Sequence, residues 1–165
     1  MRTLLLWCAS AISALACSCG PLSLEEAKQQ ADFIFRGTIV AFKPAPPDER
    51  LRGLGRDTER VVVFRVSRVW KGEVGSTFEM PASEETTGCW GFWPPFLKIG
   101  KEFLVYAWRF SGTGPVVTTI CSRTHLVQHS RDLKALGPGK RPSAIHLAHA
   151  IGYADVPPPF LAGLS

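Results

Sequence analysis

The stretch Arg60–Trp70 reads RVVVFRVSRVW, and it decides the fold class. Apolar and polar side chains alternate along it. On one face lie Val62, Phe64 and Val66, and on the other lie Arg65, Ser67 and Val69. Such alternation is typical of a β-strand with one buried face, and the Lys71-Gly72 pair that follows marks a turn. The stretch therefore predicts a mainly β protein.

Four further segments have a similar β-rich composition. They are Phe33–Phe42, Ser76–Met80, Phe103–Phe110 and Val116–Cys121. Gly37 in the first of these segments is expected to mark a bulge or a bend, and residues 111–115 (SGTGP) are typical of a hairpin turn. Five short strands with one or two short flanking helices predict a small Greek-key barrel similar to the OB-fold.

Short helices are expected on both sides of this strand region. At Leu24–Ala31, Ser23 can cap the helix, and Glu26 stands three residues later, as in a capping box. Two further helices are expected towards the C-terminus, at Asp132–Leu136 and at Pro142–Tyr153.

Residues 1–16 have the features of a cleaved export signal. Arg2 precedes an apolar run, and Ala14 and Ala16 satisfy the small-x-small cleavage rule. The run is shorter than the roughly 20 residues that a transmembrane helix needs. We therefore expect a secreted or periplasmic protein that begins at Cys17. Lipoprotein processing is the alternative: it also leaves a terminal cysteine, and it would tether the protein to a membrane through Cys17.

The cysteines support an exported protein. Of the five in the chain, Cys8 lies in the signal, and Cys17, Cys19, Cys89 and Cys121 remain. An even set in an exported chain predicts two disulfides. A bond between Cys17 and Cys19 would close a small strained ring, so two long-range pairings remain possible. Either pairing would fix the N-terminus to two distant segments.

The charge pattern argues against nucleic acid as a partner. The formal net charge is +5, and the basic residues are spread along the chain. The densest basic stretch, residues 50–60, also contains Asp57 and Glu59. A solvated loop explains it better than a phosphate-binding surface does.

No catalytic motif is present. The sequence contains no Gly-x-Ser-x-Gly, His-Glu-x-x-His or phosphate-binding loop pattern, and we expect no enzyme activity. Cys121, His125 and His129 have a spacing similar to that of metal ligands, but a disulfide is the better use of Cys121. We therefore expect neither a metal nor a cofactor of the protein's own.

An aromatic cluster follows Cys89. It consists of Trp90, Phe92, Trp93 and Phe96. Either these residues form a contact surface beside the N-terminus, or they pack over the end of the barrel. Packing is favoured because aromatic side chains bury large areas.

Together these features resemble a known family. They are the start Cys17–Pro21 (CSCGP), the short helix, the strand Phe33–Phe42, the strand end Val69–Gly72 (VWKG), and the single cysteines Cys89 and Cys121. The pattern is similar to the tissue inhibitors of metalloproteinases, and more closely to bacterial members of their netrin-like superfamily that keep only the inhibitory module. The resemblance implies a netrin-like domain at residues 17–126, followed by a helical and Pro-rich C-terminal extension at 127–165. The third disulfide of the animal module has no counterpart here.

The resemblance implies a secreted inhibitor of zinc metalloendopeptidases that acts through its N-terminus. The α-amine and carbonyl oxygen of Cys17 would chelate the catalytic zinc of the target, and Ser18 would enter its specificity pocket. Cys19, Gly20 and Pro21 would continue along the cleft. A contact ridge would be completed by Thr86, Thr87 and Gly88.

The family also implies the pairing Cys17–Cys89 and Cys19–Cys121, and the zinc would belong to the target protease. The alternative is a netrin-like scaffold, or a lipid-tethered envelope binding protein, without inhibitory activity.

Overall fold

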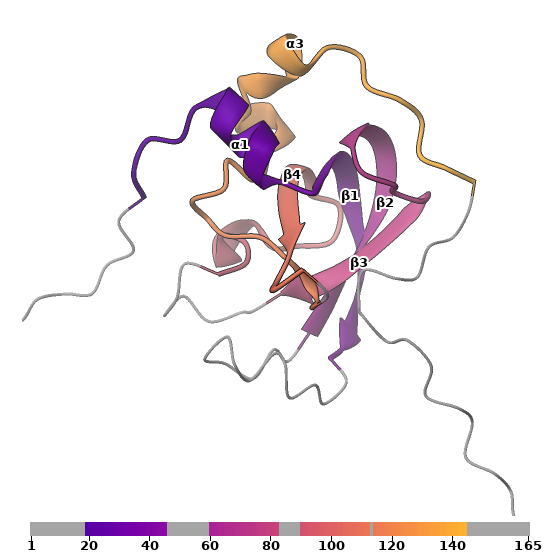
Figure 1. The fold of residues 1–165 in the computed structure, drawn as a ribbon. Coiled ribbons are helices and arrows are strands. Elements are labelled where there is room, and N and C mark those ends of the chain that lie inside the picture. Colours follow the sequence, from indigo (N-terminus) through magenta and orange to yellow (C-terminus); the bar gives the residue numbers. More distant parts are fainter. Residues whose placement is uncertain (1–18, 46–59, 83–89, 113, 145–165) are drawn as a thin grey trace, which may run out of the picture.

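The computed structural model describes residues 19–45, 60–82, 90–112 and 114–144. In these residues the chain forms an antiparallel sheet flanked by two short helices (Figure 1). The strands are β1 (Phe33–Pro44), β2 (Arg60–Lys71), β3 (Thr77–Ala82), β4 (Glu102–Arg109), β5 (Val116–Val117) and β6 (His125–Leu126). The helices are α1 (Leu24–Gln30) and α3 (Asp132–Leu136), and the 3-10 turns are η1 (Pro94–Phe96) and η2 (Val127–His129).

The strand order is β3-β2-β1-β4-β5, and β6 also pairs with β4. Every described ladder is antiparallel. In the described part of the chain the sheet is open, with β3 and β5 at its ends. The mainly β class is thus confirmed, and closure into an OB-like barrel stays a prediction.

The fifth predicted strand is shorter than expected. Val116–Cys121 was expected to be extended throughout, but only Val116 and Val117 pair with β4. The Thr118 hydroxyl instead donates to the carbonyl of Tyr106 at 2.8 Å, and the chain turns at residues 120–123. The short strand β6, which follows this turn, was not predicted.

Bulges between β1 and β2 modify the predicted alternation. Gly37 lies at a register shift, as expected, and a Cβ there would come 3.1 Å from the Cβ of Phe64. A second irregularity corrects the sequence prediction: Val69 was assigned to the face of Arg65, yet it is buried in the same core as Val66. Gly37 of β1 pairs with Val66, but its neighbour Arg36 pairs with Arg68, so β2 has one extra residue at this point. The extra residue reverses the alternation of faces along β2.

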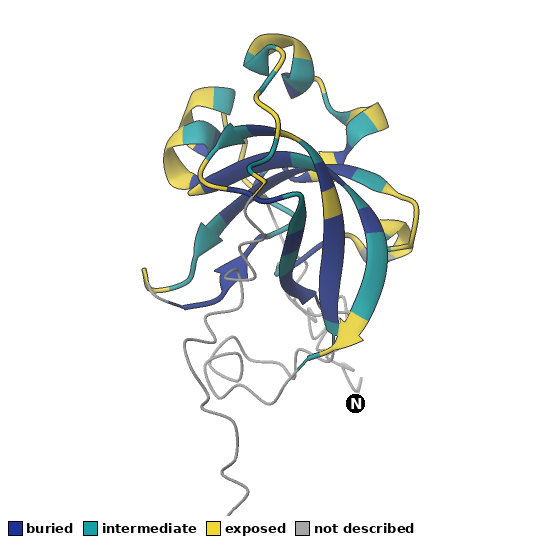
Figure 2. Cartoon of the chain, turned by 90° about the vertical axis from the view of Figure 1, so that its right-hand side faces the viewer, coloured by how far each residue is buried: buried dark blue, intermediate teal, exposed yellow. Residues whose placement is uncertain are grey.

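Both faces of the sheet are covered around β1 and β4. Within these strands, neighbouring residues alternate between two cores. Figure 2 shows that buried residues follow the strands, whereas exposed residues are frequent on the helices. The main core contains Phe35, Phe64, Met80, Phe103 and Val105, among others. The second core contains Ala27, Ala31, Ile34, Leu104 and Tyr106, with Leu22, Leu24, Trp70, Leu133 and Leu136 packed against it. Helices α1 and α3 cover this second face.

The described part of the C-terminal segment packs onto the domain. Lys140 forms a backbone bridge with Val69, and Ser143 forms one with Gly75. The helix expected at Pro142–Tyr153 does not include residues 142–144, which are not helical; the remainder lies outside the described residues. Among the described helices, none is long and apolar enough to cross a membrane.

Two glycines with the same φ angle give a test of the close packing at the end of β2. Gly72 and Gly112 both have φ +77°, but a Cβ on Gly72 would lie 2.6 Å from the Asp32 carbonyl oxygen, whereas one on Gly112 would meet nothing within 4 Å. We expect Gly112→Ala to cost about 1 kcal/mol of unfolding free energy from backbone strain alone. Gly72→Ala should cost about 2–4 kcal/mol, because the clash adds to the strain. Equal losses in urea unfolding would contradict the close contact.

Candidate functional site

The first described residues form an exposed segment that leads into α1. Cys19, Gly20 and Pro21 are exposed and belong to no helix or strand, while Leu22 is half-buried against the second core. We call residues 19–23 the N-terminal segment. The predicted zinc-chelating residue Cys17 and its neighbour Ser18 precede it and lie outside the described residues.

A disulfide attaches this segment to the turn after β5. Cys19 is bonded to Cys121 across 102 residues of sequence, with the two Cα atoms 5.1 Å apart. This is one of the two pairings that the family resemblance implied. The other involves Cys17 and Cys89, which both lie outside the described residues.

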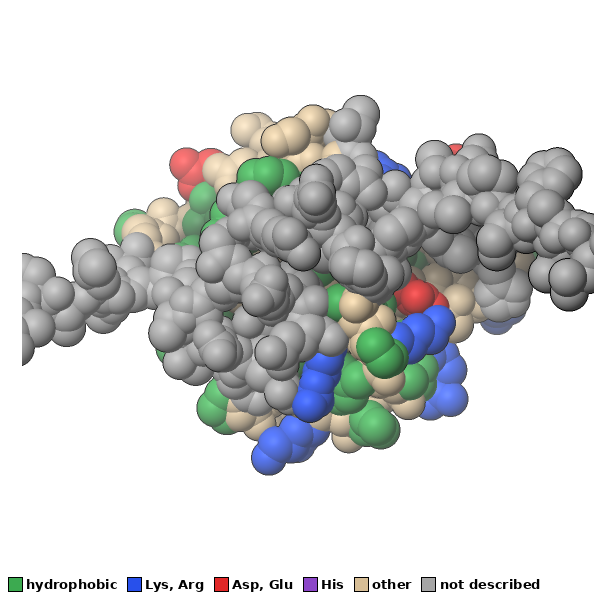
Figure 3. All heavy atoms as spheres, turned by 90° about the horizontal axis from the view of Figure 1, so that it is seen from below, with side chains coloured by type: hydrophobic (Ala, Val, Ile, Leu, Met, Phe, Trp, Pro, Cys, Tyr) green, Lys and Arg blue, Asp and Glu red, His purple; other side chains and the backbone are tan. Residues whose placement is uncertain are grey.

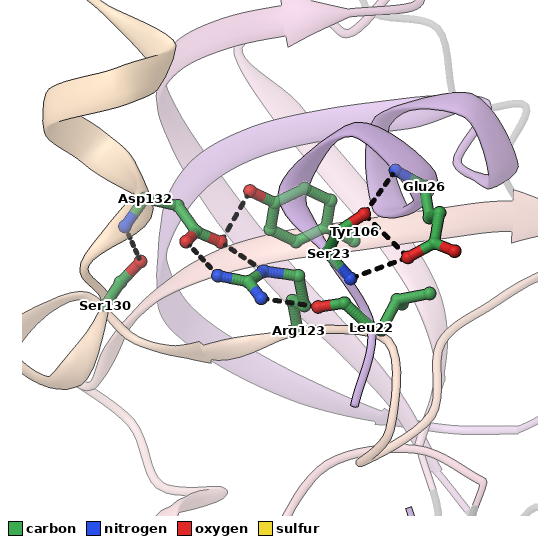
Figure 4. A network of polar contacts seen from close by, with 7 residues as sticks. All are labelled: Leu22, Ser23, Glu26, Tyr106, Arg123, Ser130 and Asp132. Atoms are coloured by element: carbon green, nitrogen blue, oxygen red, sulfur yellow. Dashed lines mark hydrogen bonds and ion pairs between the residues drawn. The ribbon is translucent and has the colours of Figure 1, made fainter. Parts of the chain in front are cut away.

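Arg123 makes a second attachment, two residues beyond the disulfide (Figure 4). Its Nη1 donates to the carbonyl oxygen of Leu22 at 2.6 Å, and its Nε donates to Oδ2 of Asp132 at 2.9 Å. A further bond joins its Nη2 to Oδ1 of Asp132, so the ion pair is bidentate. Arg123 has φ +67°, a conformation that costs a non-glycine residue about 1–3 kcal/mol and persists only where surrounding contacts hold it.

Asp132 connects this arrangement to the sheet and to α3. The Tyr106 hydroxyl, from the buried face of β4, donates to Asp132 Oδ2 at 2.8 Å. The backbone N–H of Asp132 donates to Ser130 Oγ at 3.2 Å. The Asp132 and Tyr106 residues are only 4 % and 1 % exposed, so the carboxylate depends on these partners instead of on water.

The protonation states follow from these contacts. Burial alone would raise the pKa of the Asp132 carboxyl, but hydrogen bonds from Arg123 and Tyr106, together with the Arg123 charge, lower it below its ordinary value. The hydrogen bond to Asp132 raises the pKa of Arg123. Burial, and then the bond to Asp132, raise the pKa of Tyr106. At neutral pH the group is therefore an ionised pair with a neutral tyrosine as donor.

Buried hydroxyls hold the turn that carries Cys121 and Arg123. The Thr118 and Thr124 hydroxyls donate to the Tyr106 carbonyl at 2.8 and 3.1 Å, and the Tyr106 N–H donates to Thr124 Oγ1 at 2.9 Å. Ser122 joins the group, its hydroxyl 2.8 Å from that of Thr118. Directly after Val117 the backbone no longer pairs with β4. Hydrogen bonds from these side chains hold the following turn against β4 instead.

The start of α1 holds the other end of the N-terminal segment. The predicted capping box is confirmed: Glu26 N–H donates to Ser23 Oγ at 3.2 Å, and Ser23 N–H donates to Glu26 Oε2 at 2.8 Å. Hydrogen bonds from Ser23 lower the pKa of the Glu26 carboxyl. The segment is thus fixed by a disulfide, a charged hydrogen bond and a helix cap within five residues.

The other predicted site residues are only partly described. Thr86, Thr87 and Gly88 lie outside the described residues. The residues that follow Cys89 are placed beside the Cys121 turn: Trp90 forms a backbone bridge with Thr119, and Gly91 N–H donates to the Thr118 carbonyl at 2.7 Å. This brings the segment after Cys89 close to the attachment of the N-terminal segment.

The aromatic cluster divides between packing and exposure. Phe92 is 2 % exposed and lies in the main core, and the Trp90 ring is tilted against Trp108 and meets Phe110 edge-to-face. Packing was favoured for the whole cluster, but Trp93 and Phe96 are exposed.

The residues Cys121, His125 and His129, whose spacing is similar to that of metal ligands, do not form a metal site, because the Cys121 sulfur is bonded to Cys19. In the part of the chain that the structure describes, no group of three His, Cys, Asp or Glu side chains is placed to hold a metal ion.

The sequence analysis did not identify three residues of the site. Asp132 lies 9 residues from Arg123 and 26 from Tyr106, and neither the Arg123 nor the Asp132 charge stands in a recognised motif. The one available signal was Tyr106 itself: a tyrosine in an apolar strand needs a partner for its hydroxyl when it is buried.

The disulfide and the Arg123 bond hold the N-terminal segment in place. Cys19–Leu22 contains no side chain that titrates once Cys19 is in a disulfide, so the segment can offer a partner its backbone groups but no acid or base. No protein-family model matches the chain, and no curated protein matches its sequence.

Replacing the buried carboxylate gives a pH-dependent prediction. Asp132→Asn removes the charge that Arg123 and Tyr106 contact, so we expect a loss of about 2–3 kcal/mol in unfolding free energy at pH 7. The folded pKa is lowered, so this contribution is present above the unfolded pKa near 3.9 and is lost as the pH falls through the folded value. The difference between the two proteins should therefore shrink in acid.

Denaturant unfolding between pH 3 and pH 7 measures this difference. Glu25→Gln is the control, because Glu25 makes only an exposed pair with Lys28 and its loss should change stability by less than about 0.5 kcal/mol. A constant difference across the pH range would contradict the role of the Asp132 charge.

Proposed function

We propose that the protein is an exported inhibitor of zinc metalloendopeptidases, with a netrin-like domain similar to the inhibitory module of the tissue inhibitors of metalloproteinases. It would be an inhibitor and not an enzyme. The open sheet of the described residues would belong to an OB-like Greek-key barrel at residues 17–126, with a second disulfide between Cys17 and Cys89.

One observation carries the proposal. An exposed, non-repetitive backbone segment, Cys19–Pro21, is attached to the domain by the Cys19–Cys121 disulfide and by the bond from Arg123 to Leu22. A segment that needs no ordering on binding avoids an entropic cost of about 0.5–1.5 kcal/mol for each side chain that would otherwise be immobilised. A protease cleft binds extended backbone, so a fixed exposed segment is suited to occupy one.

The chemistry of a terminal cysteine supports the same role. A catalytic zinc has three protein ligands and an open position, and it can become five-coordinate. The α-amine and carbonyl oxygen of Cys17 would close a five-membered chelate and displace the attacking water. An α-amine titrates at about 7.7–8.0, so its deprotonation at neutral pH costs little. Ser18 would enter the specificity pocket.

The remaining contacts would extend from this chelate. Gly20 is exposed, and a Cβ there would meet nothing within 4 Å, so close approach by a partner is open at this point. Thr86, Thr87 and Gly88 would form the second part of the ridge. The position of Trp90 beside Thr119 supports this, because it brings the chain that follows Cys89 to the same end of the domain.

Blocking the terminal amine tests the proposal directly. We expect a protein that begins at Cys17 to inhibit a susceptible zinc metalloendopeptidase, and a form with one extra residue before Cys17 to lose inhibition by at least about a hundredfold, because its amine can no longer reach the zinc. Both forms should melt at the same temperature. Equal inhibition by the two forms would refute zinc chelation.

The intact mass of the exported protein separates the alternatives. A free Cys17 amine permits chelation. An acylated Cys17 would block the amine and favour a lipid-tethered envelope binding protein. A free amine with no inhibition of any zinc protease would favour a netrin-like scaffold.

Arg123 gives an independent test of the support behind the segment. We expect Arg123→Ala to weaken inhibition about tenfold or more, because the Leu22 carbonyl loses its charged donor. Val62→Ala, in the main core behind the sheet, should destabilise the fold by about 2 kcal/mol and leave inhibition unchanged. Inhibition constants measured well below both melting temperatures compare the two variants. A similar loss in both would show that Arg123 acts only through global stability.

A further inference from the structure

Exposed large apolar side chains are concentrated in one short loop. In the described part of the chain they are Trp93, Phe96 and Ile99, which are 49 %, 37 % and 65 % exposed. All three fall within seven consecutive residues, and they are not explained by the proposed contact with a protease. Several exposed large apolar side chains within one short loop indicate a candidate interaction site.

The loop presents these side chains from a fixed backbone. Phe92 is buried in the main core and Leu97 packs against it, so the residues at 92 and 97 point inwards while those at 93, 96 and 99 are exposed. The 3-10 turn η1 is closed by the bond from Phe96 N–H to the Trp93 carbonyl at 2.9 Å. Gly100 N–H donates to the Ile39 carbonyl at 2.8 Å, which joins the end of the loop to β1.

The charges of the loop are all positive. Lys98 and Lys101 are exposed, and neither side chain has an ion-pair partner among the described residues. The sequence contains no Asp or Glu between Glu85 and Glu102, and Glu102 is paired with Arg36 through bonds of 2.7 and 2.8 Å. Figure 3 shows that Lys and Arg side chains also border hydrophobic ones on the described part of the lower face.

We propose that the loop Trp93–Lys101 docks the protein onto an anionic lipid bilayer. Tryptophan is enriched at membrane interfaces because its ring is amphipathic, and Phe96 and Ile99 would enter the acyl boundary beside it. Lysines flanking such residues keep their ammonium groups at the headgroups while their stems cover apolar surface. A bilayer accounts both for the three exposed apolar side chains and for the two lysines, Lys98 and Lys101, that have no ion-pair partner among the described residues. This contact needs no lipid on Cys17, which was the only route to a membrane expected from the sequence.

Vesicle sedimentation of the exported protein, shown by mass to be unacylated, tests this proposal. We expect binding to vesicles of phosphatidylcholine with phosphatidylglycerol, weaker binding to phosphatidylcholine alone, and a decline with salt. The double variant W93Q/I99Q should lose at least tenfold in binding. Lys98→Gln should lose about fivefold, as expected for one lysine near an anionic surface. Lys134→Gln, an exposed lysine on α3, is the matched control and should bind unchanged.

Several results would overturn the proposal. One is an absence of binding to the anionic vesicles at low salt. Another is equal loss in Lys98→Gln and Lys134→Gln, which would indicate a general effect of net charge. If the loop instead serves a protein partner, W93Q/I99Q should abolish a concentration-dependent dimer or weaken protease binding while vesicle binding is absent. All variants change exposed side chains, and unchanged melting temperatures would confirm that they fold.

Discussion

The carboxylate of Asp132 is almost fully buried, and the arrangement around it depends on satisfying its charge. An unpaired buried carboxylate would be strongly destabilising, so the ion pair with Arg123 and the hydrogen bond from Tyr106 must form together. Tyr106 comes from β4 and Arg123 from the turn after β5, whereas Asp132 itself begins α3. Because Arg123 also binds the Leu22 carbonyl, the N-terminal segment is positioned by the same charge.

The second core explains why this polar group lies where it does. Helices α1 and α3 are seven and five residues long, too short to be stable alone in water. Their apolar residues cover the face of the sheet formed by Ile34, Leu104 and Tyr106. Asp132 is the first residue of α3, so its bond to Tyr106 ties the helix to the sheet at the edge of this core. Packing and ion pair therefore stabilise one another.

Local sequence patterns predicted most of the strands, because strand formation depends mainly on residues that are neighbours in the chain. The alternation at Val62, Phe64 and Val66 correctly placed these three residues in the main core, although Val61 and Val63 between them are buried as well. The Ser23–Glu26 box forms within a single helical turn. The errors arise where a distant residue decides the conformation. Val69 changes face because of a bulge in its pairing with β1, and β5 ends early because Thr118 bonds to Tyr106.

The sequence by itself determined the mainly β class, the helix cap, and the presence of cysteines at positions 17, 19, 89 and 121. It left open how those cysteines pair, since two long-range pairings are compatible with the spacing. Only the tertiary structure decided that Cys19 pairs with Cys121, that Arg123 joins Leu22 to Asp132, and that Trp93 and Phe96 face outwards while Phe92 is buried. The physical reason is that these outcomes depend on the folded positions of strands and turns up to about a hundred residues apart, whereas strand and helix patterns are set by neighbours a few residues away.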